Sequence, residues 1–183
     1  MIKDEIIDLA RIECQKQGIT LPLVLGFIET ESGGDQWAYN PEPKYRYLWS
    51  CRAHAPFRPI TKLEDSSEYP PDDFPAPEAG VDPDAEWWGQ QASWGLMQVM
   101  GAVAREVGFR GPFLTSLCDP EINLAVGCTK LKRLLKQWGD PEMAACAYNR
   151  GSVGYVPNTK EFLNQKYVDK VMLNANFWLS KGV

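Results

Sequence analysis

The sequence has a single histidine, His54, and lacks the short patterns that bind metals or nucleotides. A Ser-His-Asp triad would have to use this one imidazole. No HExxH segment, no CxxC pair and no zinc-like spacing of His and Cys occurs. A glycine-rich phosphate loop is also missing. We therefore expect no metal site and no cofactor.

Long apolar runs are missing too. None approaches the roughly 20 residues that a membrane-spanning helix needs. The N-terminal segment MIKDEIIDLA has acids where a secretory signal has its hydrophobic stretch, so no signal peptide is expected. The five cysteines are an odd number, and Cys14, Cys128 and Cys146 fall in helical apolar patterns, where a thiol packs as a small core residue. These features favour a chain made in a reducing compartment.

Basic residues are missing from one segment. Between Glu64 and Glu86 there are nine acids and no Lys or Arg, in a chain whose formal net charge is −5. Without those nine acids the remainder would carry +4. A mildly basic body with one acidic segment gives no reason to expect nucleic acid as a partner.

The acidic segment lies in a longer proline-rich region at about 41–90. Nine of the fourteen prolines fall between Pro41 and Pro83, and a loop of this length is usually functional or disordered. Aromatic residues in it and at its edges argue against low complexity: Tyr45, Tyr47, Trp49, Phe57, Tyr69, Phe74, Trp87 and Trp88. Two interpretations stay open, an irregular excursion anchored by aromatic side chains, or one wall or lid of a binding cleft.

Outside this region the apolar spacing is helical. Apolar residues at 6, 7, 10 and 14 predict a first helix that ends at Gly18. Thr20 as N-cap predicts a second helix that reaches Ser32. A third helix is predicted from Ser93 to Gly108.

Two further helices are predicted to begin at the same motif, Asp-Pro-Glu, at 119–121 and at 140–142. Asp is a good N-cap, Pro suits the first helical position, and Glu faces the positive helix end. The second of these helices should end at Gly151. The buried stripe of the first is predicted to be Leu124, Cys128, Leu131 and Leu135.

A last long helix is predicted over about 159–181, carrying Phe162, Tyr167, Val171 and Phe177. No stretch shows sustained period-two alternation, so the pattern predicts an all-α fold. A chain of 183 residues is long enough for one well-buried core and short for two.

Two glutamates lie two residues apart at the end of the second predicted helix. Successive helical residues turn by about 100°, so Glu29 and Glu31 point about 200° apart. Glu31 continues the apolar stripe of Val24 and Ile28, and Glu29 lies toward the other side. Burial disfavours a charged carboxylate and raises its pKa, as a general acid working near neutral pH requires. A salt bridge or a helix cap is the alternative role for Glu31.

Three short segments follow one another along the chain: ESG at 31–33, GLMQVM at 95–100 and AYNRG at 147–151. Two others fit between and after them, DPEINLAVG at 119–127 and YVDKV at 167–171. Together they resemble the motifs of the soluble lytic transglycosylases, relatives of goose-type lysozyme, over roughly 20–40 and 91–172. The resemblance implies a single, predominantly helical lysozyme-like domain over 1–183, of the α+β lysozyme-like superfamily, with a long irregular insertion at about 41–90.

The implied reaction is cleavage of the β-1,4 bond between N-acetylmuramic acid and N-acetylglucosamine in peptidoglycan. By resemblance, Glu31 is the single general acid and base. It protonates the glycosidic oxygen and then takes the proton of the C6 hydroxyl group, which attacks C1 and leaves a 1,6-anhydro end. This scheme differs from the usual glycosidase pair of two carboxylates.

The resemblance also implies substrate-binding residues around Glu31. They are Ser32, Ser93, Met97, Gln98, Met100, Ala147, Tyr148, Asn149 and Tyr167. The amides suit sugar hydroxyl and N-acetyl groups, and Tyr148 offers a ring face and a hydroxyl group that could reach Glu31. Structural roles are the alternatives: core packing for the methionines and Tyr167, close chain approach for Ala147, and backbone organisation for the two amides.

The sequence departs from the family pattern in places. About fifty extra residues separate ES from GLMQ, so the serine usual in that connection cannot be placed, and Ser93 is one candidate. Gly101 replaces a proline after Met100. Arg150 replaces a common alanine and either meets carboxylates of the peptide stem or is solvated.

Two other functions compete with this interpretation. A goose-type muramidase would hydrolyse the same bond with Glu31 and a second carboxylate, for which Asp35, Asp84 or Glu86 are candidates. A non-catalytic peptidoglycan-binding module is the alternative of another class.

The expected partner is the glycan strand of peptidoglycan, bound by a monomer without nucleic acid and without membrane insertion. The missing signal peptide suggests a bacteriophage endolysin or a virion-associated enzyme. Such a protein would be made in the cytoplasm and reach the wall in the periplasm through a holin or as part of the virion.

Overall fold

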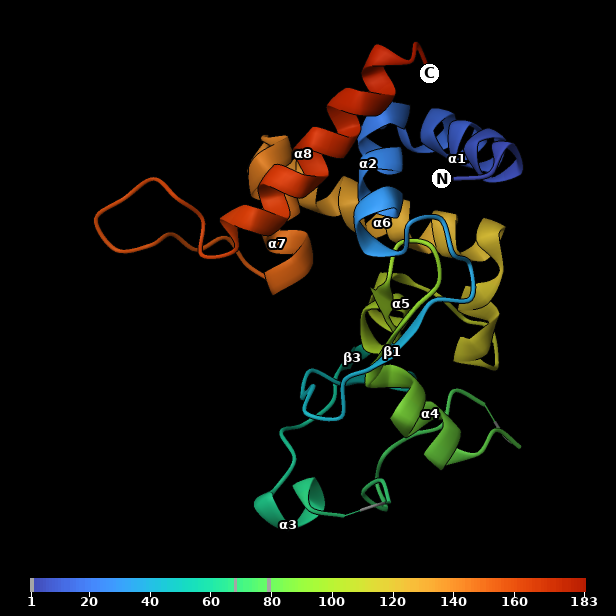
Figure 1. Cartoon of the computed structure of the whole chain (residues 1–183). Helices are drawn as coiled ribbons and strands as arrows, with labels where there is room; N and C mark the ends of the chain where they lie inside the picture. Colours follow the sequence, from blue (N-terminus) through green and yellow to red (C-terminus); the bar gives the residue numbers. More distant parts are fainter. Residues whose placement is uncertain (1, 68, 79) are drawn as a thin grey trace.

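The computed structural model describes residues 2–67, 69–78 and 80–183. It is predominantly helical, as the sequence predicts. In Figure 1 one part of the molecule contains α1, α2, α6, α7 and α8 together with both termini, and the other contains the short strands, α3 and α4. In chain order the elements are α1 (Asp4–Gln17), α2 (Leu21–Glu31), β1 (Tyr39–Pro41), β2 (Trp49–Ser50), β3 (Ala55–Pro56), α3 (Lys62–Asp65), α4 (Pro83–Gln90), β4 (Ala92–Trp94), β5 (Val99–Met100), α5 (Gly101–Val107), the 3₁₀ helix η1 (Leu114–Cys118), α6 (Pro120–Trp138), α7 (Pro141–Arg150) and α8 (Gln165–Ser180).

Helix α2 is buried along most of its length and packs against α8. Gly26 makes this approach possible, because a Cβ atom there would lie 2.8 Å from both the Val171 carbonyl oxygen and the Ala175 nitrogen. The predicted end of α1 at Gly18 is confirmed, with a left-handed φ of 71°. The C-terminal end of α2, which carries Glu31, is therefore fixed against α8.

Both Asp-Pro-Glu helix starts are confirmed. The Asp119 carboxylate accepts hydrogen bonds from the Glu121 and Ile122 nitrogens, and Asp140 accepts one from the Met143 nitrogen. Helix α7 ends at Gly151, which has a φ of 82°. The predicted stripe of α6 is buried at three of its four positions, and the fourth, Leu135, packs partly buried against the core.

The predicted third helix is wrong in its first half. Residues 92–100 form the antiparallel pair β4–β5, with β1 on the other side of β4, and α5 begins only at Gly101. Gly95 has a φ of 67° and Gln98 a φ of 44°, a left-handed conformation that cannot continue a right-handed helix. The buried amide of Asn123 holds this turn, donating to the Trp94 and Leu117 carbonyl oxygens and accepting from the Met97 nitrogen.

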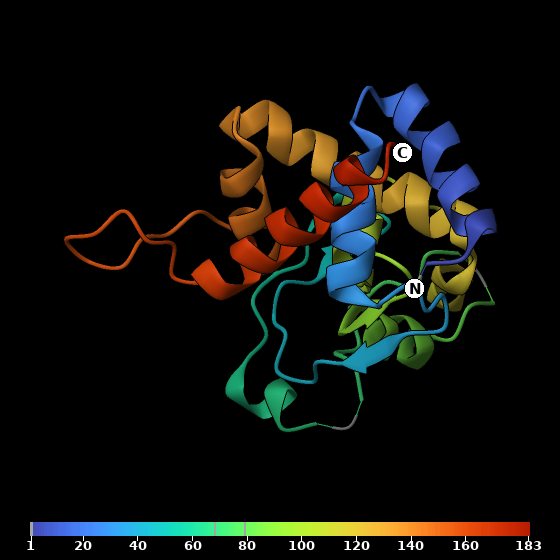
Figure 2. The ribbon, with the colours of Figure 1, turned by 45° about the horizontal axis from the view of Figure 1, so that its top comes forward.

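The last helix begins at Gln165, later than predicted. The preceding residues form a loop that projects from the body between α7 and α8 (Figures 1 and 2). An antiparallel bridge pairs Tyr155 with Phe162, whose rings stack with their centroids 5.1 Å apart. Within α8 the buried aromatic residue is Trp178, and Phe177 is 50% exposed.

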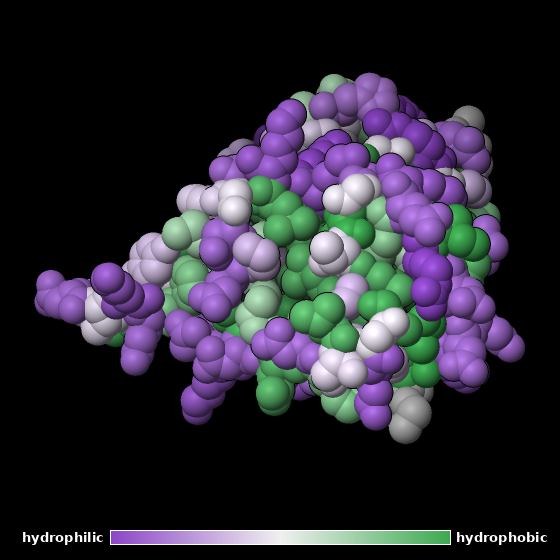
Figure 3. Space-filling view, turned by 90° about the horizontal axis from the view of Figure 1, so that it is seen from above, coloured by the Kyte–Doolittle hydropathy of each residue, from purple (hydrophilic) through white to green (hydrophobic). Residues whose placement is uncertain are grey.

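Apolar side chains also remain on the surface of α8, including Leu173 and Leu179. Figure 3 shows a mixed face, with apolar areas bordered by hydrophilic side chains. None of the helices formed by the described residues has the length and apolar character to span a membrane.

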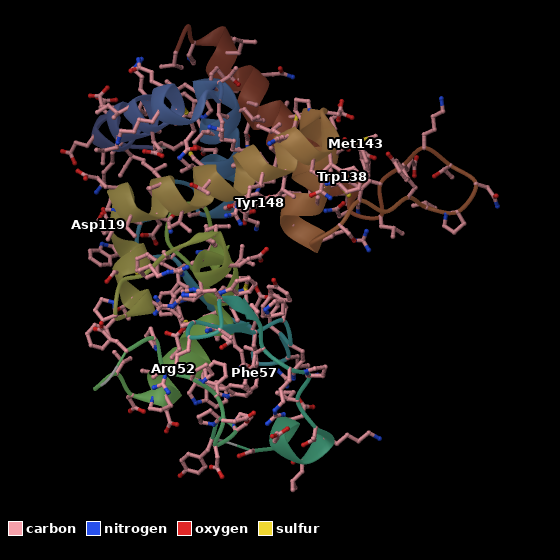
Figure 4. All side chains as sticks on the ribbon, turned by 180° about the vertical axis from the view of Figure 1, so that it is seen from behind. Arg52, Phe57, Asp119, Trp138, Met143 and Tyr148 are labelled. Carbon is pink, nitrogen blue, oxygen red and sulfur yellow. The ribbon has the colours of Figure 1, made fainter. Side chains whose placement is uncertain are left out.

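The insertion has a small core of its own. Leu48, Phe74 and Trp87 are buried together, with Phe57 and Ile60 packed against them. Figure 4 shows Phe57 in this part of the molecule, away from Trp138 and Met143 at the helical end. At its C-terminal edge the insertion is tied to α5 by an ion pair between Glu86 and Arg105, whose side chains are both 1% exposed. Aromatic side chains thus build a cluster within the insertion that is separate from the main core.

Candidate functional site

A cavity of about 980 Å³ opens beside the end of α2. It is lined by Glu31, Asn40, Glu42, Tyr45, Tyr47, Ser93, Gln98, Met100, Val103, Glu106, Lys130, Tyr148, Asn149, Arg150, Gly151 and Ser152. These residues come from α2, the insertion, the β4–β5 pair, α5, α6 and the end of α7. The cavity therefore lies where the helical part meets the insertion.

Glu31 is the last residue of α2 and lies half-buried in the cavity wall. The hydroxyl group of Tyr167 on α8 donates a hydrogen bond to its Oε1 atom. Burial raises the pKa of Glu31 above its usual value, and the charge of Glu42 raises it further. The Tyr167 hydrogen bond and the charges of Lys130 and Lys170 oppose this rise without cancelling it. The carboxyl group therefore keeps its proton to higher pH than an exposed glutamate.

Glu29 does not line the cavity. It is half-buried as well, and its Oε2 atom is buried with no hydrogen-bond partner among the described residues. The expected separation of the two glutamates on the helix is thus present, although Glu29 is less solvated than its position suggested.

Tyr148 lies in the cavity wall but does not bond to Glu31. Its hydroxyl group donates to the Met97 carbonyl oxygen at 2.9 Å, and its ring packs on Phe27 with centroids 4.7 Å apart. The expectation that this hydroxyl group could reach Glu31 is wrong, because the hydroxyl group bonds to a backbone carbonyl oxygen of the GLMQ segment. Tyr167, from the last helix, makes that contact instead.

Gln98 and Ser93 face the cavity and also bond to each other. The Ser93 hydroxyl group donates to Gln98 Oε1 at 3.0 Å, and Gln98 Nε2 donates to the Ala38 and Gly95 carbonyl oxygens. Gln98 thus ties the turn between β4 and β5 to the segment before β1. These hydrogen bonds to backbone carbonyl oxygens are the backbone-organising role given above as the alternative for Gln98.

Four of the proposed contact residues lie outside the cavity lining: Ser32, Met97, Ala147 and Tyr167, the last of which reaches the site through its hydrogen bond to Glu31. Met97 is fully buried, packed against Gly127, and Ala147 is 1% exposed. The Ser32 hydroxyl group donates to the Leu96 carbonyl oxygen at 2.8 Å and accepts from the Gly34 nitrogen. Direct side-chain contact from Met97 or Ala147 is therefore not available, since both belong to the core.

Met100, Asn149 and Arg150 do line the cavity. The Asn149 side-chain oxygen accepts a hydrogen bond from Asn164 at 3.0 Å, which leaves its amide nitrogen for a ligand. Arg150 is exposed and forms no ion pair among the described residues.

The acids suggested as a second carboxylate lie elsewhere. Asp35 is exposed and caps the Trp37 nitrogen, Asp84 lies at the start of α4, and Glu86 is paired with Arg105. None of the three lines the cavity, whereas Glu42 and Glu106 do. The sequence pattern did not single out either of these two acids.

Sequence reasoning also missed Lys130, Tyr45 and Tyr47 as individual site residues. In the sequence, the two tyrosines stand out only as aromatic residues of the insertion. Lys130 follows Asn123 and Gly127 at positions i+7 and i+3, on a face of α6 where both of those residues are buried. A lysine on the buried face of a predicted helix is the sequence feature that could have indicated Lys130 as a site residue.

The fold and the site together define a lysozyme-like protein, with a protonatable carboxyl group in a wide cleft between helices and a short sheet. The family model for the transglycosylase SLT domain matches residues 8–167, and the chain belongs to this family. The family indicates a lytic transglycosylase-type enzyme that acts on peptidoglycan. A search of curated proteins finds no match.

The described residues contain no group of three or more His, Cys, Asp or Glu side chains placed to hold a metal ion. All five cysteines are free thiols. The cavity lining carries carboxyl, amide, phenol, hydroxyl, ammonium and guanidinium groups.

Proposed function

We propose that the protein is a lytic transglycosylase that cleaves the β-1,4 bond between N-acetylmuramic acid and N-acetylglucosamine, with Glu31 as general acid and base. The observation that carries this proposal is the half-buried Glu31 carboxyl group in the cavity wall, with its pKa raised by burial. The family match supports the substrate class.

In the first step, protonated Glu31 gives its proton to the glycosidic oxygen while the bond from that oxygen to C1 breaks. In the second, the Glu31 carboxylate takes the proton of the C6 hydroxyl group, whose oxygen forms a new bond to C1. The proton balance closes, and water is not consumed. Tyr167 supports the intermediate stage, because its hydroxyl group already donates to Glu31 and bonds more strongly to a carboxylate.

The remaining lining residues would bind the glycan strand. Asn149 and Asn40 offer amide groups for N-acetyl and hydroxyl groups. Tyr45 and Tyr47 bring aromatic surface from the insertion. We therefore infer that the chain acts as one domain over 1–183, in which the insertion at 41–90 forms one wall of the cleft.

Hydrolysis is the second candidate function. Glu42 and Glu106 line the same cavity as Glu31, and either carboxylate could position a water molecule for attack at C1. A binding module without catalysis is a third possibility; it would hold peptidoglycan equally well after Glu31→Gln.

Product analysis separates these functions. Purified sacculi are digested with the protein, and the released fragments are analysed by mass spectrometry. The transglycosylase predicts 1,6-anhydro ends, lighter by one water than the reducing ends that a hydrolase produces. Reducing ends alone would overturn the proposed reaction, and no fragments at all would favour the binding module. The expected setting, lysis of a bacterial host by a phage enzyme, stays a prediction that lysis assays on intact and permeabilised cells would test.

A further inference from the structure

Lys130 is a half-buried ammonium group in the cavity wall that the steps above do not use. Its Nζ atom donates to the Tyr148 carbonyl oxygen at 2.9 Å and lies 3.5 Å from the centroid of the Tyr148 ring. Figure 4 shows Tyr148 beside α6, on the side that faces the insertion. One carbonyl group and one ring thus fix the position of this charge.

The surroundings explain why a cation is held there. The Tyr148 carbonyl group lies in the last turn of α7, where the helix dipole favours positive charge. The aromatic ring adds a cation–π attraction. An ammonium group has three protons, and Lys130 makes no other hydrogen bond among the described residues. Its remaining protons are therefore available on the cavity side.

The charges around the acid come from several elements. Glu31 on α2 and Lys130 on α6 line the same cavity, as does Glu42 from the insertion. The Tyr167 hydroxyl group bonds to Glu31, and the charges of Lys130, Lys170 and Glu42 act on the pKa of Glu31. Glu106 on α5 lines this cavity too, and the charges of Glu31, Glu42 and Glu106 act on the pKa of Lys130. Burial lowers the pKa of Lys130 to about 8, and the three acids oppose this fall, so the group stays mostly protonated at neutral pH.

Lys130 and Lys170 are not equivalent. Lys170 is exposed and donates to the Thr30 carbonyl oxygen at 3.2 Å. Lys130 is less solvated and has the larger effect on Glu31 of the two. A charge in a poorly solvated site acts more strongly on its neighbours than one in water.

We infer that Lys130 is a positioning residue whose fixed ammonium charge stabilises the Glu31 carboxylate that forms when the acid has given up its proton. This inference rests on the proposed function. The negative charge on Glu31 develops during bond cleavage, so the ammonium group stabilises the transition state more than the bound substrate. Loss of this charge should therefore lower kcat and leave KM nearly unchanged.

The direction of the pH effect follows from the same contact. Only protonated Glu31 can act as the acid, so the rate falls as pH rises through its pKa. The Lys130 charge holds that pKa down, and its removal lets the pKa rise. The alkaline fall in rate should then move to higher pH, while the maximal rate decreases.

The test compares Lys130→Met, Lys130→Arg and Lys132→Met on soluble glycan strands. Lys132 is an exposed residue of α6 and serves as the matched control for charge. We expect Lys130→Met to lower kcat about tenfold or more, the change that one pKa unit of interaction represents, and to shift the alkaline limb upward. Lys130→Arg should recover part of the rate, and Lys132→Met should behave like the wild type.

A second measurement does not depend on the stability of the Lys130 variants. NMR titration of the Lys130 side chain in the wild type and in Glu31→Gln should show a lower pKa in the variant, because the carboxylate charge that favours the ammonium form is gone. An unchanged Lys130 pKa, or a Lys130→Met variant with wild-type kcat and pH profile, would overturn the inference. An equal loss of rate in both Lys130 variants without a shift of the limb would also overturn it. An active Glu31→Gln variant would instead overturn the proposed function itself.

Discussion

Tyr167 donates a hydrogen bond from its hydroxyl group to Oε1 of Glu31, which connects α8 to the last residue of α2. The two residues are far apart in the chain, and the close packing of α2 on α8 at Gly26 brings them together. The carboxyl group that we propose as the acid is thus oriented by a phenol from the last helix.

Tyr167→Phe removes this hydrogen bond. Because the bond lowers the pKa of Glu31, we expect that pKa to rise and the Glu31 side chain to be less well oriented. The activity should fall about 10- to 100-fold, and the alkaline limb of the pH profile should move upward. Tyr155→Phe is the matched control, because it removes the hydroxyl group of an exposed tyrosine that lies outside the cavity lining and has no hydrogen bond to Glu31 among the described residues. Wild-type activity in Tyr167→Phe would show that the contact has no role in the reaction.

Glu31 should make the folded state less stable as the pH rises. The pKa of Glu31 is higher in the folded protein than in the unfolded chain. The stabilisation from the bound proton is therefore fully present below the pKa of the unfolded state, and it is lost as the pH rises through the pKa of the folded state. Glu31→Gln should therefore have a higher Tm than the wild type at pH 8 and nearly the same Tm at pH 4. Calorimetry at both pH values measures the difference, and a lower Tm for the variant at pH 8 would contradict the assigned direction.

The buried Glu86–Arg105 pair should anchor the insertion. Glu86→Gln leaves the Arg105 guanidinium group buried without its partner charge, which typically costs about 3–5 kcal/mol of unfolding free energy. The ion pair between Arg58 and Glu64 lies on the surface of the same region, so Glu64→Gln should change stability little. Urea unfolding of both variants provides the comparison. Equal effects would mean that the buried pair is not the anchor.

Tyr47 tests the insertion as a wall of the cleft. The residue lines the cavity and is 38% exposed, so Tyr47→Ala should raise KM several-fold with little change in Tm. Tyr69→Ala is the matched control, because Tyr69 is 64% exposed in the same insertion and lies outside the cavity. If both variants keep the wild-type KM, the insertion is only a structural addition.

The sequence predicted the features that local chemistry determines. Asp119 and Asp140 cap their helices through their own side chains, and Gly18 ends α1 because only glycine adopts its φ angle without strain. The position of Glu31 on the inner face of α2 followed from helical periodicity alone.

Features that depend on distant residues could not be predicted in the same way. The strands at 92–100 have a helix-compatible pattern, and the Asn123 side chain from α6 holds the turn between them. The hydroxyl group of Tyr148 bonds to Met97 rather than Glu31 because that same turn presents a carbonyl oxygen to it. Glu42 and Lys130 enter the cavity from segments whose relative placement no local pattern specifies.

The central claim is that the carboxyl group of Glu31 transfers the proton in the cleavage reaction. Its most direct test is the initial rate at which Glu31→Gln and Glu29→Gln release soluble fragments from purified sacculi, with circular dichroism to confirm that both variants fold. We predict a loss of about 10²-fold or more for Glu31→Gln and wild-type release for Glu29→Gln. Wild-type release by folded Glu31→Gln, or loss of release only in Glu29→Gln, would contradict the claim.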